Sequence, residues 1–191
     1  MKKVLIINGH PNESSLNRAI TESFSKGTID AGNDVRIIHL SELQFDPNLH
    51  FGYSQRLDLE PDILLAQEQI LWCDHLVVVH PVWWGGMPAL LKGFIDRALL
   101  PKFAFQYREN SVWWDKLLAG RTAEILYTID QPIFYYKWFN GAPGIKQLKR
   151  MILQFCGFKV KRVTGFQQVR YANEERISEW LRKAEKLGRK V

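Results

Sequence analysis

Polar residues suited to holding an anion follow the first apolar run of the chain. Residues 4–7 (Val-Leu-Ile-Ile) are typical of a parallel strand buried on both faces. Ser14 or Ser15 can cap a helix just after this run, because a serine hydroxyl accepts from the free N–H groups of a first helical turn. Those N–H groups, the helix dipole and the side chains of His10, Ser15 and Asn17 would together attract an anion, of which phosphate is the simplest. The same residues are also compatible with an ordinary capped turn.

Two tryptophans and two glycines lie together after a later apolar run, residues 76–79. The segment is Pro81-Val82-Trp83-Trp84-Gly85-Gly86-Met87-Pro88. Glycine lets a backbone approach a flat ligand closely, and tryptophan offers a rigid stacking surface. In an open α/β sheet, ligands bind at the carboxyl ends of the strands, which is where this segment falls. The alternative is that the two tryptophans close the end of the sheet or lie in an interface.

Two further segments are rich in aromatic side chains. Residues 101–107 contain Phe103, Phe105 and Tyr107, and residues 128–132 (Thr-Ile-Asp-Gln-Pro) lead into Phe134-Tyr135-Tyr136. The first segment is a candidate wall of a ligand pocket and is about equally compatible with simple packing.

The elements that must position these loops alternate along the chain. Strands are expected over residues 4–7, 35–40, 76–79, 123–128 and 158–166, and helices over residues 15–31, 61–72, 89–99, 143–155 and 173–188. This alternation predicts an α/β fold, a doubly wound five-stranded parallel sheet with helices on both faces. The strand order 2-1-3-4-5 would place the loops after the first, third and fourth strands side by side. The last strand is less apolar and is expected at an edge.

Several positions carry more specific expectations. Gly27 should weaken the end of the first helix, and Gly157 should end the helix over 143–155 in a left-handed conformation. In the helix over 61–72, Leu64, Leu65 and Leu71 are apolar neighbours across turns. The helix over 89–99 has a wide apolar stripe, which predicts burial by the sheet on one side and by a second subunit on the other.

Composition limits the class of protein. A chain of 191 residues with 46% hydrophobic and 24% charged residues fits one soluble domain, residues 1–191. The net charge of +6 is mildly basic, but no nucleic-acid-binding motif accompanies it.

Cys73 and Cys156 are far apart and lie outside any Cys-x-x-Cys motif, which favours buried free thiols in a reducing compartment. The histidines are scattered, so no metal site is expected. No segment has the roughly 20 apolar residues of a membrane span or the pattern of a signal peptide, and we expect a cytoplasmic protein.

Taken together, the loops resemble those of the bacterial NAD(P)H dehydrogenase (quinone) family, which has a flavodoxin-like fold. The most specific matches are Gly9-His10-Pro11 with Ser15-Leu16-Asn17, the segment 81–97, and Phe155-Cys156-Gly157-Phe158. The resemblance covers nearly the whole chain.

The resemblance implies a flavin site and assigns residues to it. The cofactor-binding residues would be His10, Ser15, Leu16 and Asn17 at the flavin phosphate, Gln67 as a further contact, Pro81, Val82, Trp83, Trp84 and Gly85 along the ring, and Thr128 and Asp130 at its pyrimidine edge. Phe105 and Tyr107 correspond to residues that line the substrate pocket of the partner subunit in a homodimer. Tyr136 corresponds to a tyrosine that assists hydride transfer.

The implied activity is that of a flavin-dependent NAD(P)H:quinone oxidoreductase. Hydride would pass from NAD(P)H to flavin N5 and then, after NAD(P)+ leaves, to a quinone or similar acceptor. FMN is favoured over FAD, because the short chain has no obvious adenine site. Two departures from the family stand out: Thr128-Ile129-Asp130-Gln131 replaces Thr-Thr-Gly-Gly, and no histidine follows His80 to partner Tyr136.

Two other functions remain open at this stage. Relatives in the family act as flavin-binding ancillary subunits of potassium-efflux systems. A one-electron flavodoxin carrier is the other alternative, although such carriers are usually acidic and this chain is basic.

Overall fold

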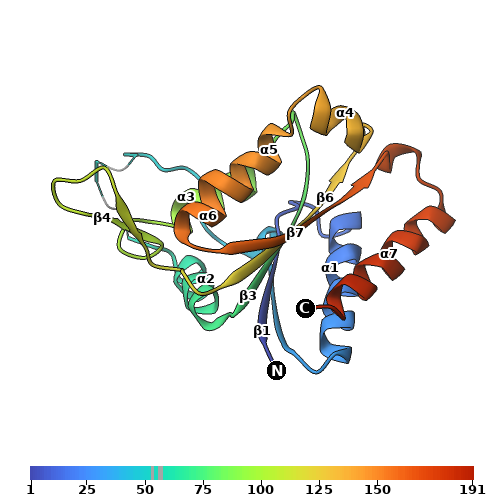
Figure 1. Cartoon of the computed structure of the whole chain (residues 1–191), viewed down its shortest axis with the longest axis horizontal. Coiled ribbons are helices and arrows are strands. Elements are labelled where there is room, and N and C mark those ends of the chain that lie inside the picture. Colours follow the sequence, from blue (N-terminus) through green and yellow to red (C-terminus); the bar gives the residue numbers. More distant parts are fainter. Residues whose placement is uncertain (53, 56–57) are drawn as a thin grey trace.

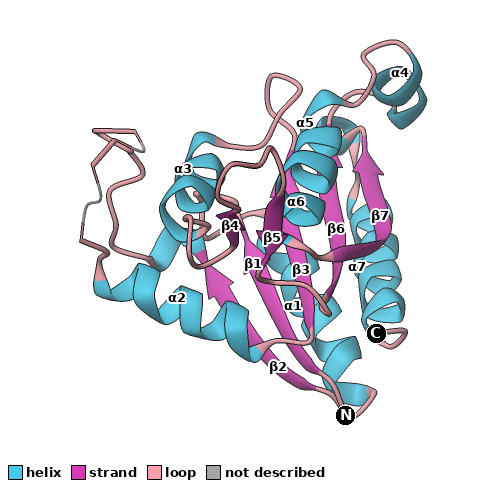
Figure 2. Cartoon of the chain, turned by 60° about the vertical axis from the view of Figure 1, so that its left-hand side comes forward, coloured by secondary structure: helices cyan, strands magenta, loops and turns pink. Residues whose placement is uncertain are grey.

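A parallel sheet of five strands forms the centre of the computed structural model, which describes residues 1–52, 54–55 and 58–191. The strand order is β2-β1-β3-β6-β7, and every neighbouring pair is parallel (Figures 1 and 2). Counting only these five strands, the order is 2-1-3-4-5, so the predicted fold class and topology are confirmed, including the edge position of the last strand. The strands are β1 (Lys3–Asn8), β2 (Asp34–His39), β3 (His75–Pro81), β6 (Thr122–Ile129) and β7 (Lys159–Gln167).

Helices cover both faces of the sheet. On one face lie α1 (Leu16–Asp30) and α7 (Glu174–Gly188). On the other lie α2 (Pro61–Trp72), α3 (Ala89–Ala98) and a continuous helical segment made of α5 (Pro143–Lys146), a π-helical stretch (Gln147–Leu153) and α6 (Gln154–Cys156) (Figure 2). Gly157 ends this segment with φ +113°, which is the predicted left-handed stop.

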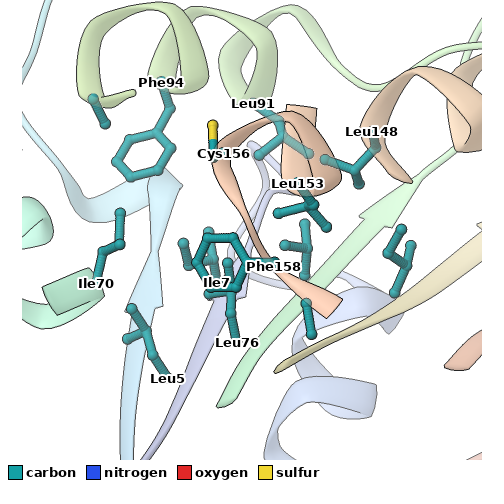
Figure 3. Close-up of a cluster of buried hydrophobic side chains, with 14 of the residues drawn as sticks. Leu5, Ile7, Ile70, Leu76, Leu91, Phe94, Leu148, Leu153, Cys156 and Phe158 are labelled. Atoms are coloured by element: carbon teal, nitrogen blue, oxygen red, sulfur yellow. The ribbon is translucent and has the colours of Figure 1, made fainter. Parts of the chain in front are cut away.

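The apolar runs serve two separate cores because side chains alternate along a strand. Val4 and Ile6 of β1 pack with Ile20 and Phe24 of α1. The intervening residues, such as Leu5, face the larger core on the other side, where α2, α3 and the segment 143–156 meet the sheet (Figure 3). A strand that is buried on both faces has no polar alternation, which explains why the sequence shows unbroken apolar runs.

The glycine expected to weaken α1 instead allows a close helix contact. A Cβ atom on Gly27 would lie 1.9 Å from the carbonyl oxygen of Glu185 in α7, and one on Gly188 would lie 2.1 Å from that of Phe24. The two helices therefore meet backbone to backbone, and this contact offsets the low helix propensity of glycine.

Three local features differ from the sequence-based expectations. A short helix, α4 (Ile133–Trp138), and an antiparallel pair, β4 (Phe105–Tyr107) with β5 (Trp114–Lys116), were not expected. Both are too short to give a recognisable period. In α2, the three leucines noted above are about half exposed, and Ile63, Ala66 and Ile70 form the buried face.

The loop between β2 and α2 covers part of the apolar stripe on α3. Phe45 packs edge-to-face on Phe94 with ring centroids 6.0 Å apart, and Pro47 lies against Gly93, where a Cβ atom would be only 2.4 Å away. Arg97 holds the end of the loop through Glu60, at 2.7 Å. A segment of the same chain thus provides part of the cover that was expected from a second subunit.

The two cysteines are free and buried. Burial raises the pKa of each thiol, Cys73 and Cys156, to about 12. Among the described residues, no histidine, cysteine, aspartate or glutamate side chains cluster as metal ligands would. Over the same part of the chain, no helix combines the length and apolar character needed to cross a bilayer.

Candidate functional site

The first loop at the carboxyl edge of the sheet is an ordered set of side-chain-to-backbone hydrogen bonds. Asn8 Oδ1 accepts from the backbone N–H of His10 at 3.2 Å, and His10 Nδ1 accepts from that of Asn12 at 3.0 Å. Ser15 is the N-cap of α1, with Oγ accepting from Arg18 N–H at 3.2 Å. Leu16 therefore opens the helix, and its N–H is among those without an intrahelical partner.

His10 presents a hydrogen-bond donor to this region. Its Nδ1 accepts a hydrogen bond, so the hydrogen of the neutral ring is on Nε2. Burial lowers the pKa of His10. At neutral pH the imidazole is therefore an uncharged donor.

Asn17 joins the first turn of α1 to the end of β6. Its Oδ1 accepts from Thr128 Oγ1 at 3.0 Å, while its buried Nδ2 has no hydrogen-bond partner among the described residues. A buried amide donor without a partner is costly, and a ligand acceptor would remove that cost. Both residues line the same cavity.

The loop after β3 is a tight hairpin turn. Trp83 and Gly86 exchange two backbone hydrogen bonds of 2.9 Å, and the two residues between them have positive φ, +50° at Trp84 and +77° at Gly85. This combination is a type I′ turn, in which glycine is favoured and tryptophan is rare. The indole of Trp84 is fully exposed, so it does not close the end of the sheet.

Trp83 lies beside the first loop. Its ring meets that of His10 edge-to-face, with centroids 5.4 Å apart. Val82 N–H donates to Thr128 O at 2.8 Å, which fixes this loop against the loop after β6.

The loop after β6 is fixed by Asp130. Its Oδ1 accepts from the backbone N–H of Arg170 at 2.9 Å, which holds the 3₁₀ turn Val169–Tyr171 beside the site. The Asp130 carboxylate therefore has a structural partner, and it also places a negative charge at the edge of the cavity.

These loops enclose one cavity of about 260 Å³. Nine of the twelve residues expected to bind a cofactor line it. The full lining is His10, Asn12, Ser15, Leu16, Asn17, Pro81, Val82, Trp83, Thr128, Ile129, Asp130 and Val169. Sequence reasoning missed Asn12, Ile129 and Val169. The first two are loop neighbours of expected residues, whereas Val169 follows the edge strand and carried no signal.

Three of the expected cofactor residues lie outside this cavity. Gln67 Nε2 donates to Ala98 O at 2.8 Å and so ties α2 to α3. Gly85 O accepts from Gly144 N–H and from Tyr136 Oη, each at 2.9 Å, and Trp84 points into solvent.

Tyr136, the expected catalytic residue, is fully buried beneath the Trp83–Gly86 turn. Its hydroxyl is engaged with Gly85 O, and burial raises its pKa. In this position the side chain supports the turn.

The two expected substrate-pocket residues are on β4, away from the cavity of their own chain. Phe105 packs on Phe155 with ring centroids 5.0 Å apart, and Tyr107 is exposed. Their assignment to the pocket of a partner subunit stays a prediction.

The residues present fit a ligand with a phosphate at one end and a flat ring at the other. The N-terminus of α1, the His10 donor and the unpartnered Asn17 Nδ2 suit the phosphate. Trp83 and the neighbouring Pro81-Val82 backbone offer a wall for the ring.

The fold and this site define a flavodoxin-like protein. The chain belongs to the flavodoxin-like fold family, whose model matches residues 2–187.

Three known proteins show how close the relationships are. The chain is 30% identical over 160 residues to an uncharacterised NAD(P)H oxidoreductase of Haemophilus influenzae, covering 81% of this chain and 78% of that protein. It is 28% identical over 191 residues to the ribosyldihydronicotinamide dehydrogenase [quinone] of Pongo abelii, covering 83% and 78%. The crystal structure of Smu.1420 from Streptococcus mutans UA159 has a TM-score of 0.85 and 30% identity over 99% of this chain and 100% of that one.

Proposed function

We propose that this chain is a flavin-dependent NAD(P)H:quinone oxidoreductase. The observation that carries the proposal is the convergence of three loops on one cavity in which a buried amide donor, Asn17 Nδ2, has no partner among the described residues. The relatives named as an NAD(P)H oxidoreductase and as a ribosyldihydronicotinamide dehydrogenase [quinone] support the same reaction. FMN is the flavin we favour.

Each loop has a separate task in this proposal. The first turn of α1, with His10 and Asn17, holds the phosphate. Trp83 covers the ring and excludes water from one side, and Tyr136 holds the turn that carries Trp83 through Gly85. When bound, a flavin supplies two-electron hydride chemistry, while the protein supplies position and polarity. No acid–base pair of side chains is required.

The direct test is turnover. Purified protein supplied with FMN should oxidise NADH or NADPH when menadione is present, and the rate should saturate with both substrates. The matched variant is Asn17→Asp, which keeps the acceptor for Thr128 and replaces the free donor by a carboxylate oxygen. Absence of menadione-dependent oxidation with either nicotinamide, in protein shown to bind FMN, would refute the enzyme assignment.

We also propose that the active form is a homodimer. The β4–β5 pair supports this, because Tyr107 and Trp113 expose large aromatic surfaces without lining the cavity of their own chain. Light scattering should give a mass of twice 22.3 kDa, and Tyr107→Ala should alter KM for the acceptor more than FMN binding. A monomer mass in a fully active sample would contradict this arrangement.

A further inference from the structure

A second cavity lies at the opposite edge of the sheet. Its volume is about 610 Å³, and its lining includes His75 and Thr122, which begin β3 and β6. The flavin cavity is lined by residues at the other ends of the same strands, Pro81 and Thr128. Six residue steps along a strand separate the two edges by about 20 Å.

The cavity is surrounded by cationic side chains. Lys2, Lys161, Arg162 and Lys190 all line it. Within residues 1–52, 54–55 and 58–191, no ion pair involves any of the three lysines.

Two carboxylate side chains, Glu124 and Asp74, also lie in the lining. Glu124 is buried and pairs with Arg162 through two hydrogen bonds of 2.8 and 2.7 Å. Asp74 Oδ2 accepts from the backbone N–H of Lys3 at 2.9 Å. The Glu124–Arg162 pair is neutral, so three lysine charges face the Asp74 carboxylate and the α-carboxylate of the last residue, Val191, and the net charge of the lining is positive.

His75 adds a buried donor without a partner. The residue is 3% exposed, and its Nε2 has no hydrogen-bond partner in the described part of the chain. Thr122 Oγ1 lies 2.7 Å from His75 Nδ1, and Glu124 Oε1 lies 3.9 Å from Nε2; the nearby carboxylate favours the tautomer in which Nε2 carries the hydrogen and the Thr122 hydroxyl donates to Nδ1. The ring hydrogen is then on Nε2.

The protonation state of His75 is consistent with this donor. Burial lowers its pKa to about 4, and the charges of Lys2, Arg162 and Lys161 act in the same direction. The ring is neutral at neutral pH, and its Nε2–H lies 3.9 Å from Glu124 Oε1, too far for a hydrogen bond.

We propose that this cavity binds a small anion carrying a phosphate group, held by Lys2, Lys161 and Lys190 and by the Nε2–H of His75. Lysines suit a multiply charged oxyanion because each acts as a flexible point charge. The Glu124 pair fixes Arg162 as part of the wall. The site is independent of the flavin, and its proposal does not rest on the oxidoreductase activity.

The test follows the histidine ring signals of ¹⁵N-labelled full-length protein by NMR at pH 7.5. Inorganic phosphate is added at constant ionic strength, with sodium chloride as the comparison. The same titration is repeated with FMN present, because phosphate can also compete at the first loop, which His10 reports. We expect a saturable shift of His75 Nε2 in both titrations.

Paired variants separate this site from general charge effects. Lys161→Gln/Lys190→Gln should weaken phosphate binding at His75 at least about tenfold. Lys149→Gln/Arg150→Gln, which removes the same charge from the π-helical stretch Gln147–Leu153, should leave it unchanged. Equal responses to phosphate and chloride at His75, or unchanged affinity in the first pair of variants, would overturn the proposal.

Discussion

At the scale of single residues, Asn17 connects folding to ligand binding. One atom of its amide holds Thr128, and the other is a buried donor that only a ligand can satisfy. The hydrogen bond to Oδ1 contributes to the stability of the folded protein, and the Nδ2 donor contributes to ligand binding. A substitution that changes only one of these atoms can therefore separate the two roles.

Asn17→Asp should reduce FMN affinity much more than stability. The carboxylate still accepts from Thr128, but it places a negative charge beside the proposed phosphate. We expect FMN to bind at least about tenfold more weakly by fluorescence titration. Asn17→Ala is the comparison, and it should also cost about 1–3 kcal/mol of unfolding free energy, because it leaves the Thr128 hydroxyl without its acceptor. Wild-type affinity in Asn17→Asp would remove Asn17 from the site.

His80 makes stability depend on pH. The ring is fully buried, its Nδ1–H donates to Pro81 O at 2.8 Å, and burial lowers its pKa to about 4 from an ordinary value of 6.5. The unfolded chain therefore binds a proton below pH 6.5, whereas the folded chain does so only near pH 4. Stability should fall as pH falls through this window, by roughly 1–2 kcal/mol at pH 5 from this group.

Urea unfolding at pH 7, 6 and 5 measures this dependence. His75 contributes in the same direction, since burial also lowers its pKa to about 4. His80→Gln should make the free energy of unfolding depend less steeply on pH, but some dependence should remain. A wild-type free energy that is constant from pH 7 to 5 would show that these rings do not remain neutral in the fold.

Residue-level predictions from the sequence succeeded where a signal was local. The Ser15 cap is confirmed, and His10, Asn17 and Trp83 do meet at one cavity. Val169 could not be found, because only the folded Asp130–Arg170 contact brings it there. Tyr136 matched a family position, but its burial beneath the turn depends on packing that no local pattern encodes.

At the scale of elements, the turn after β3 is stabilised from below. Gly85 O accepts from both Tyr136 Oη and Gly144 N–H. The turn itself contains Trp84 at a positive φ, which costs conformational energy that these contacts offset.

Tyr136→Phe distinguishes support of the turn from a role in proton transfer. If the Tyr136 hydroxyl supports the turn, removing it should lower the free energy of unfolding by about 0.5–1.5 kcal/mol and weaken FMN binding modestly. The pH profile of kcat should then be unchanged. A general acid would behave differently: kcat would fall on the order of 100-fold or more with its pH profile altered. Steady-state kinetics and urea unfolding of the same samples provide both measurements.

Gly27→Ala tests the contact between α1 and α7. Helix propensity alone predicts a gain of about 1 kcal/mol. The added Cβ would lie 1.9 Å from Glu185 O, so the helices must separate, and we expect a net loss of about 1–3 kcal/mol. Ile29→Ala, at an exposed position of the same helix, should change stability by less than about 0.5 kcal/mol. A stabilised Gly27→Ala protein would mean that the two backbones are further apart.

Elements were predictable in proportion to their length. Apolar residues located all five strands of the sheet, as unbroken runs in β1 and β3, and the Ser15 cap located the start of α1. The β4–β5 pair and α4 were not predictable, because each element has too few residues for a period to show. In α2, a leucine-rich sequence concealed the true buried face, which tertiary packing selected.

At the scale of the whole molecule, the parallel sheet separates two kinds of chemistry. The carboxyl ends of β3 and β6 line the cavity proposed for the flavin, and the amino ends of the same strands line the cationic cavity. The predicted strand order required the loops to meet at the carboxyl edge of the sheet. The cationic cavity at the amino edge was not predicted, because its lysines are distant in sequence and are typical of solvated surface charges.

The two cavities should act independently. Between the two cavities the strands carry mostly buried apolar side chains, so we expect little coupling between the loops at one edge and the lysines at the other. Saturation with FMN should change phosphate affinity at His75 by less than about twofold. A larger change in the NMR titration would show coupling between the two edges of the sheet.

Because the two native thiols are unreactive, the distance between subunits of a complex can be measured with a label on one introduced cysteine. Both cysteines ionise only near pH 12, so maleimide reagents used near neutrality should leave them untouched. A cysteine introduced at Ser111, in the exposed turn between β4 and β5, would then be the single reactive position. Spin labels attached there would report how far apart the two hairpins lie in a solution complex, without any need for a cysteine-free background.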